Sequence, residues 1–257
     1  MIRAAGVVLA FSLLVPAVAG TSNGRAPIGL TASPSRLMLT GSGSATIRLA
    51  NTGSRPVVVD ARRAAFALDL RGRPKIVKRS GPRAATSWLR LQPRRLVLRP
   101  GATASVTVAA RVPRPVEPGD HDALVLLATR PLRAGGVAMR MRIGVVVVVR
   151  APGRIVRRLE LRRLRVLRGG RTRVLELLVV NHGNVTEHLG RRRLALTVAQ
   201  PGHGIVKLRH SGRRMLPRTR GVVLFPYRGR LGGWATARVT IGQGSAVVTR
   251  RLFRIRL

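Results

Sequence analysis

Short runs in which apolar residues occupy every second position are the feature that most constrains this fold. In residues 103–112 alanine and valine alternate with mostly polar residues. Such a run has one apolar face only as an extended strand, because successive strand side chains point to opposite faces. Similar runs occur at 45–49, 139–143 and 253–257, and glycine, proline, asparagine and serine separate them. The pattern predicts an all-β protein of antiparallel sheets with its arginines in solvent.

A weak internal repeat predicts two domains. Segments 35–53 and 163–183 both show an alternating strand, a glycine turn, a second strand and then Asn-x-Gly. Asn and Gly are expected to adopt positive φ angles there and to close a tight connection. A chain of 257 residues suits two ordinary domains, and its turn signals have the spacing of β-sandwiches. We expect tandem immunoglobulin-like β-sandwich domains at 28–150 and 151–257, with a linker at 20–27.

Two segments bear directly on this prediction. The valine run at 144–149 needs burial on both faces, since an exposed apolar edge invites aggregation. Residues 155–168 combine arginine with leucine, which also suits a basic amphipathic helix on a membrane surface. Most of their apolar residues recur at every second position, except at Arg162-Arg163, where one extra residue interrupts the alternation. This pattern favours a strand with a bulge. Trp88 and Trp234 are expected among the few large residues of an otherwise aliphatic core.

Residues 1–19 have the three parts of a secretory signal peptide. Arg3 provides the positive charge, residues 4–15 are apolar or small, and Ala17-Val18-Ala19 has the form of a cleavage site. The apolar stretch is shorter than the roughly 20 residues that a membrane-spanning helix needs. The sequence predicts cleavage near Ala19 and a secreted or cell-envelope-associated protein. It contains no cysteine, so disulfides cannot stabilise it.

Positive charge dominates the composition: 49 Lys and Arg against 8 Asp and Glu give a formal net charge of +41. Such a surface attracts polyanions. Because the protein is expected to be exported, we predict that its partner is an anionic envelope polymer or a surface protein. A specific nucleic acid is not expected as the partner, since the chain has too few aromatic residues to stack on bases. Peripheral membrane contact and the oligomeric state stay open.

Guanidinium groups bind phosphate and carboxylate in bidentate geometry. The arginine clusters of the second half are therefore candidate polyanion-binding residues, with a solvated charged face as the alternative. These candidates are Arg157, Arg158, Arg162, Arg163, Arg165, Arg191, Arg192, Arg193, Arg213 and Arg214.

The sequence shows no recognisable catalytic, metal-binding or cofactor-binding constellation, so we expect a binding protein and not an enzyme. Asp120-His121-Asp122 is the one notable cluster of acidic residues. Strand alternation would send His121 to the face opposite the two aspartates, and we expect a solvated turn followed by the start of a strand. The other histidines lack ligand spacing and are expected in turns or arginine-rich loops: His182, His188, His203 and His210.

A family resemblance is carried by turn-and-strand segments in a fixed order: Ser33–Leu37, Ala50–Gly53, Ser87–Leu89, Leu98–Ala102, Val116–His121 and Val180–Val185. Together they resemble the tandem immunoglobulin-like domains of secreted Gram-positive, especially actinobacterial, proteins related to the WxL-protein-interacting family. The resemblance covers nearly all of the mature chain. It implies a non-enzymatic scaffold of the cell envelope that engages peptidoglycan or other surface proteins.

The same segments are more distantly similar to PapD-like periplasmic pilus chaperones, which also consist of two immunoglobulin-like domains. That similarity implies an alternative function, in which the protein donates a strand to a client. It also implies a basic pair in the interdomain cleft that holds the client carboxylate. Arginine is so abundant in this sequence that no single pair can be selected.

Overall fold

The structure, a computed structural model, describes residues 26–134, 137–169, 172–229, 231–243 and 246–257. These residues form strands and one short 3-10 helix, which confirms the predicted all-β class. None of their helices is long and apolar enough to cross a bilayer. The predicted leader at 1–19 and most of the predicted linker at 20–27 lie outside the described residues.

The first sandwich contains β1 (Leu30–Ser33), β2 (Arg36–Thr40), β3 (Gly43–Asn51), β4 (Val57–Leu68), β5 (Pro74–Val77), η1 (Thr86–Trp88), β6 (Leu89–Gln92), β7 (Arg95–Leu98), β8 (Thr103–Ala110), β9 (Gly119–Thr129), β10 (Leu132–Ala134), β11 (Val137–Met139) and β12 (Arg142–Ala151). One sheet has the order β1-β3-β8-β6. The facing sheet has the order β2-β12-β9-β4-β5, and β7 also pairs with β4. Strands β10 and β11 form a separate hairpin.

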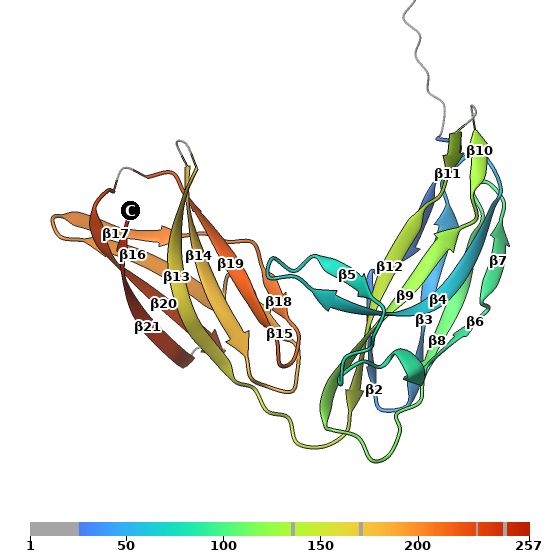
Figure 1. The fold of residues 1–257 in the computed structure, drawn as a ribbon, viewed down its shortest axis with the longest axis horizontal. Coiled ribbons are helices and arrows are strands. Elements are labelled where there is room, and N and C mark those ends of the chain that lie inside the picture. The colour runs from blue at the N-terminus through green and yellow to red at the C-terminus, as the bar shows by residue number, and fades with distance from the viewer. Residues whose placement is uncertain (1–25, 135–136, 170–171, 230, 244–245) are drawn as a thin grey trace, which may run out of the picture.

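The second sandwich contains β13 (Leu159–Gly169), β14 (Thr172–Asn181), β15 (Glu187–Leu189), β16 (Leu194–Gln200), β17 (His203–Leu208), β18 (Arg213–Met215), β19 (Arg220–Tyr227), β20 (Trp234–Gln243) and β21 (Ala246–Arg256). Its sheets have the orders β13-β14-β19 and β17-β16-β20-β21, and β15 pairs with β18. In Figure 1 the two sandwiches meet at an angle and are joined by the connection between β12 and β13.

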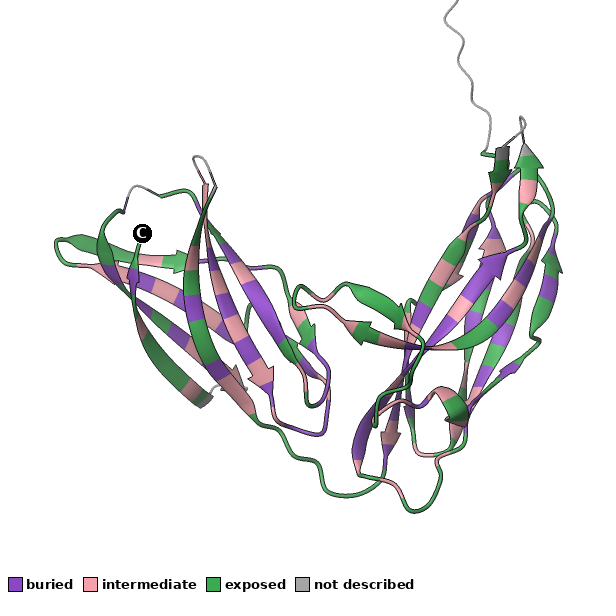
Figure 2. Cartoon of the chain, viewed as in Figure 1, coloured by how far each residue is buried: buried purple, intermediate pink, exposed green. Residues whose placement is uncertain are grey.

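Each sandwich has its own hydrophobic core, visible as the buried inner faces in Figure 2. The first core extends to Val149 and the second begins at Leu161. Strand β12 ends at Ala151, and the domain boundary expected between residues 150 and 151 stays a prediction. Trp88 packs half-buried against the first core. The expectation for Trp234 is wrong: it is 55% exposed because it lies on the solvent face of β20, where the Arg254 guanidinium covers its ring at 4.6 Å.

The two ambiguous segments are both strands. The valine run lies in β12, which pairs in parallel with β2 on one side and antiparallel with β9 on the other. Its side chains are largely buried on both faces, as expected of a central strand. Residues 159–169 form β13, so the amphipathic helix is excluded. The register of β13 with β14 shifts between Leu161 and Arg163, which confirms the predicted bulge.

The two halves of the internal repeat have the same structure at Asn-x-Gly, but their preceding strands are arranged differently. Strands β13 and β14 pair with each other, whereas β2 and β3 lie in different sheets. Asn51 and Asn181 are both buried, and the Oδ1 atom of each accepts a hydrogen bond at 2.9 Å from the backbone N–H of the glycine two residues later, Gly53 or Gly183. Neither glycine has a positive φ. The expectation on φ is wrong because the asparagine side chain itself closes the turn.

We expect replacement of Asn181 by alanine to lower the free energy of unfolding by about 2–3 kcal/mol, measured by denaturant titration. The Nδ2 atom of Asn181 donates to the carbonyl oxygens of Val185, Met215 and Leu216. Alanine would leave these buried acceptors and the Gly183 N–H without their partner. As the control, Gln200→Ala removes one exposed side-chain bond and should change stability much less. Equal losses in the two variants would contradict this account.

Candidate functional site

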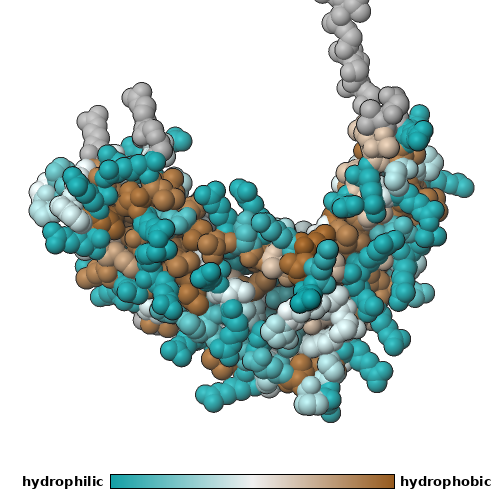
Figure 3. All heavy atoms as spheres, viewed as in Figure 1, coloured by the Kyte–Doolittle hydropathy of each residue, from teal (hydrophilic) through white to brown (hydrophobic). Residues whose placement is uncertain are grey.

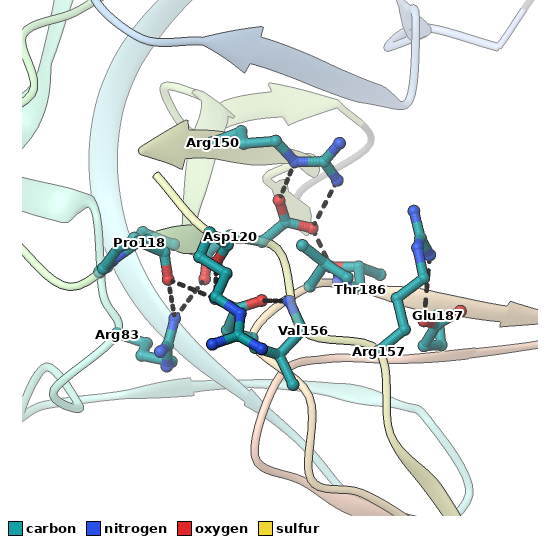
Figure 4. Close-up of polar contacts among 12 residues, drawn as sticks. Arg83, Pro118, Asp120, Arg150, Val156, Arg157, Thr186 and Glu187 are labelled. Atoms are coloured by element: carbon teal, nitrogen blue, oxygen red, sulfur yellow. Dashed lines mark hydrogen bonds and ion pairs between the residues drawn. The ribbon is translucent and has the colours of Figure 1, made fainter. Parts of the chain in front are cut away.

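The junction between the sandwiches is organised around the Asp120 carboxylate, which has no exposed surface. Arg150 donates to it in bidentate geometry, from Nε to Oδ1 at 2.7 Å and from Nη2 to Oδ2 at 3.2 Å. The backbone N–H of Thr186, in the second sandwich, donates to Oδ2 at 2.7 Å. Figure 4 shows these contacts meeting at one carboxylate. The expected solvated turn is therefore wrong, because residues 183–186 of the second sandwich cover the start of β9.

His121 is also buried, and Asp122 is partly buried on the opposite face of β9. His121 packs its ring on Trp88 at 4.4 Å between centroids, and its Nε2 lies 2.8 Å from the carbonyl oxygen of Glu117. Asp122 faces the other way, and its Oδ1 has no hydrogen-bond partner. Burial raises the pKa of Asp122 to about 7, although the nearby positive charge of Arg36 opposes this shift. Among the described residues, no three histidines or acidic residues gather as a metal site would require.

A second buried carboxylate, Glu187, engages two of the arginines expected to bind polyanions. The Nη1 atom of Arg157, on the connection between the sandwiches, lies 3.0 Å from Oε1 of Glu187. Arg193 binds the other oxygen. These two guanidinium groups neutralise a buried charge inside the protein. Because Arg157 remains exposed while it makes this contact, polyanion binding by these two arginines stays a prediction.

A cavity of about 370 Å³ lies between the two sandwiches. Arg36, the first residue of β2, lines it from the first sandwich, and Arg213 and Arg214 of β18 line it from the second. Burial, followed by the charge of Arg214, lowers the pKa of Arg36, but a guanidinium stays protonated at any physiological pH. The cavity is therefore a partly enclosed, cationic space suited to an anionic group of matching size.

The hairpin of β4 and β5 closes one side of this cavity. Its tip reaches the second sandwich in Figure 1. The backbone N–H of Val222 donates to the carbonyl oxygen of Leu70 at 2.7 Å, and Nη2 of Arg213 donates to the same oxygen at 3.1 Å. Arg71 and Gly72 at the tip line the cavity beside Arg213. The hairpin thus links the two sandwiches in addition to the covalent connection and the contacts around Asp120.

The edge of β12 opens toward this cavity. Pairing with β2 covers Val146 to Arg150 only. The N–H of Val146 donates to the carbonyl oxygen of Ser35, so even-numbered residues of β12 direct their backbone groups to that side. Gly144 and Arg142 come next, and no described strand pairs with them there. Their backbone donors and acceptors form an unpaired edge.

The ten candidate arginines do not form one surface. Arg213 and Arg214 lie at the cavity, while Arg162 and Arg163 lie together on β13. Arg191 donates to the carbonyl oxygen of His210. The remaining candidates are also exposed: Arg158, Arg192 and Arg165, which follows Arg163 on the same face of β13.

The histidines differ from expectation in part. His210 is buried, contacts Phe225 at 4.9 Å between ring centroids and bonds the carbonyl oxygen of Leu194. His188 and His203 lie in strands β15 and β17, whereas His182 lies in a turn and His210 in the arginine-rich loop between β17 and β18, as expected.

Sequence reasoning did not select Arg36, and it noted Asp120 but placed it in a solvated turn and not at the junction. Arg36 carried no local signal, because it is one arginine among many and its position depends on the pairing of β2 with β12. Asp120 could have been singled out by scarcity, since only 8 acidic residues are present in the chain. A carboxylate at a strand start in so basic a protein is more informative than any of the arginines.

No protein-family model matches the chain, and no curated protein sequence does. Solved structures do match it. One is a chaperone–tip adhesin complex of CFA/I fimbriae biogenesis, with 11% identity, coverage of 88% of this chain and 98% of the other, and a TM-score of 0.51. Another is the class 5 fimbriae chaperone CfaA, with 11% identity, coverage of 88% and 99%, and a TM-score of 0.50. Identity at this level supports the fold alone. The chain has the two-sandwich, immunoglobulin-like fold that is also found in PapD-like fimbrial chaperones.

Proposed function

We propose that this protein is an exported, non-enzymatic chaperone of the cell envelope that holds an extended segment of a surface-protein client. The observation that carries the proposal is the open edge of β12, which leads directly to the arginine-lined cavity at Val146 and Arg36. An incoming strand can pair with an unpaired edge through main-chain hydrogen bonds, and side-chain pockets then provide specificity. The fold shared with fimbrial chaperones agrees with this function.

The residues along the edge suit a shared sheet. Met141 and Ile143 are half-buried and pack against the first core, and Met139 continues the row on β11. Methionine adapts to varied neighbours at low cost. A client strand beside β12 would extend this apolar row, because paired strands place side chains on common faces. The protein therefore offers a client both backbone partners and an apolar surface.

Arg36 is the proposed anchor for the end of the client. It pairs in register with Val146, which is the first residue of β12 that β2 covers and so borders the open edge. A carboxylate that ended a strand on this edge would enter the cavity beside the Arg36 guanidinium, with Arg214 near it. Charge-assisted bonds in a partly enclosed site are stronger than those in water. The proposal thus names Arg36 and Arg214 as the basic groups of the cleft, a choice that the sequence left open.

Replacement of Arg142 by proline is expected to abolish client binding at the edge while leaving the fold intact. Proline removes the outward N–H at an edge position that tolerates it. Arg142→Ala is the matched control, since it removes the same side chain but keeps the N–H. The measurement is photo-crosslinking in the native envelope fraction, with a crosslinking residue at Ile143 in the wild-type, Arg142→Pro and Arg142→Ala backgrounds and, for comparison, at Arg48 of β3. A discrete adduct from position 143 that only proline removes is expected.

Equal crosslinking from both positions, or an adduct that survives the proline change, would instead favour the second candidate function. That candidate is an envelope scaffold of the kind implied by the WxL-related resemblance, held on anionic polymers by dispersed arginines. The exposed Arg158, Arg165 and Arg192 are the observation in its favour. Its own signature is salt-sensitive retention on isolated cell walls, which the proline change would leave unaltered.

A further inference from the structure

The bulge in β13 creates a second cationic feature on the second sandwich. Regular alternation would place Arg162 and Arg163 on opposite faces of the sheet. The register shift between Leu161 and Arg163 instead leaves both arginines exposed on one side, with Leu161 and Leu164 buried on the other. Bulges re-aim side chains in this way and are frequent beside functional sites. The two guanidinium groups therefore stand side by side on the outer face.

These arginines form one wall of a shallow groove of about 500 Å³. Leu178 and Val180 of β14 form its floor, and Arg220 of β19 forms the opposite wall. The register explains this arrangement, since Arg163 pairs with Leu178 and Val180 pairs with Arg220. The groove thus has an apolar floor one strand wide between two cationic rims.

The rims are only partly neutralised. Arg162 pairs with Glu160 at 3.2 Å, and Glu160 also contacts His182. Among the described residues, no acidic group forms an ion pair with Arg163 or Arg220. An acidic ligand would therefore meet two guanidinium groups that are free to form bidentate contacts.

The groove continues the interdomain cavity. Val222, which lines the cavity, is the register partner of Leu178, which lines the groove, so the two share one face of the sheet. Figure 3 shows hydrophobic residues gathered over the region of β13, β14 and β19, with hydrophilic side chains around them. A segment that occupied the cavity could continue across this face without leaving the protein.

We propose that this groove binds a further part of the client, namely an extended peptide segment in which acidic and apolar residues alternate. The proposal rests on the proposed function for the identity of the partner, and the groove geometry supplies the chemistry. Alternation in an extended segment places all apolar side chains on one face, toward Leu178 and Val180. The acidic side chains then point away from the floor, and the long side chains of Arg163 and Arg220 can extend from the rims to meet them.

The test is binding of a synthetic ten-residue peptide of alternating Glu and Val to the full chain, measured by fluorescence anisotropy. The variant Arg163→Glu/Arg220→Glu should weaken binding about tenfold or more, equivalent to loss of one or two charge-assisted contacts. Arg90→Glu/Arg192→Glu is the matched control: both arginines are exposed, neither lines the groove, and the change in net charge is the same. It should weaken binding less than threefold.

Two comparisons can overturn the proposal. Equal losses in the two double variants would mean that the peptide responds to overall charge and not to the groove. Equal affinity for an alternating Glu and Ser peptide would mean that the apolar floor contributes nothing and that any polyanion binds. Arg142→Pro should leave this peptide affinity unchanged, so failure of the groove and failure of the proposed edge function give different results.

Discussion

Replacement of Asp122 by asparagine is expected to stabilise the protein strongly above pH 7 and hardly at all near pH 4. The wild-type side chain is partly buried, and its Oδ1 atom is inaccessible to solvent and has no hydrogen-bond partner. Its pKa of about 7 in the fold, at about 1.4 kcal/mol per pKa unit, corresponds to a penalty of roughly 4 kcal/mol for the buried charge. Asparagine has nearly the same shape and cannot ionise. The melting temperature of the first sandwich should rise by on the order of 10 °C at pH 8.

The sign follows from proton linkage. Below pH 4 Asp122 is protonated in both the folded and the unfolded chain, so the substitution removes no charge. Between pH 4 and pH 7 the unfolded chain releases this proton while the folded protein keeps it, and stability falls as the pH rises. Above pH 7 the full penalty is present. His121, whose pKa burial lowers, has the opposite pH dependence, but it is common to both proteins and largely cancels in the difference.

Asp69→Asn is the matched control for this measurement. Hydrogen bonds from the backbone N–H groups of Arg73 and Arg71 lower the pKa of Asp69. Its ionised form therefore stabilises the hairpin turn at neutral pH, and this contribution is lost as the pH falls through the lowered pKa. Asp69→Asn should be neutral or destabilising at pH 8. A gain of the same sign in both variants would show that loss of any negative charge, and not burial of Asp122, is responsible.

Replacement of Asp120 by alanine should lower the free energy of unfolding by about 3 kcal/mol or more and should loosen the two sandwiches relative to each other. The change leaves the Arg150 guanidinium half-buried without its bidentate partner, and it leaves the N–H of Thr186 unpaired. The second loss breaks a contact between the sandwiches. Denaturant unfolding measures the first effect, and small-angle scattering measures the second as a broader distribution of interatomic distances.

Glu117→Ala is the control for the junction. Glu117 also forms ion pairs, with Arg83 and, across the junction at 3.9 Å, with Arg218 of the second sandwich, but its side chain is 55% exposed. Exposed pairs contribute little because water and salt screen them. We therefore expect a much smaller change in stability and an unchanged scattering curve. If Asp120→Ala left the scattering curve unchanged while stability fell, the carboxylate would stabilise only the first sandwich and would not fix the junction.

The sequence by itself determined the class of fold and the local form of its strands. Alternation requires no distant partner, because the two faces of a strand follow from backbone geometry alone. The strands at 103–110 and 253–256, the buried valine run and the bulge at Arg162-Arg163 were all readable for this reason. The two asparagine turns were found as well, although the reason assigned to them was wrong.

Only the tertiary structure decided which charged residues meet. Arg36 and Val146 are far apart in sequence and come together because β2 pairs in parallel with β12. Arg157 and Arg193 appeared equivalent to the other arginines until Glu187 was found buried between them. The alternating pattern predicts only that a polar side chain points away from the core of its own sheet. The pattern does not predict whether that side chain meets solvent, the second sandwich or a buried carboxylate. Its surroundings depend on packing between elements that are distant in the chain.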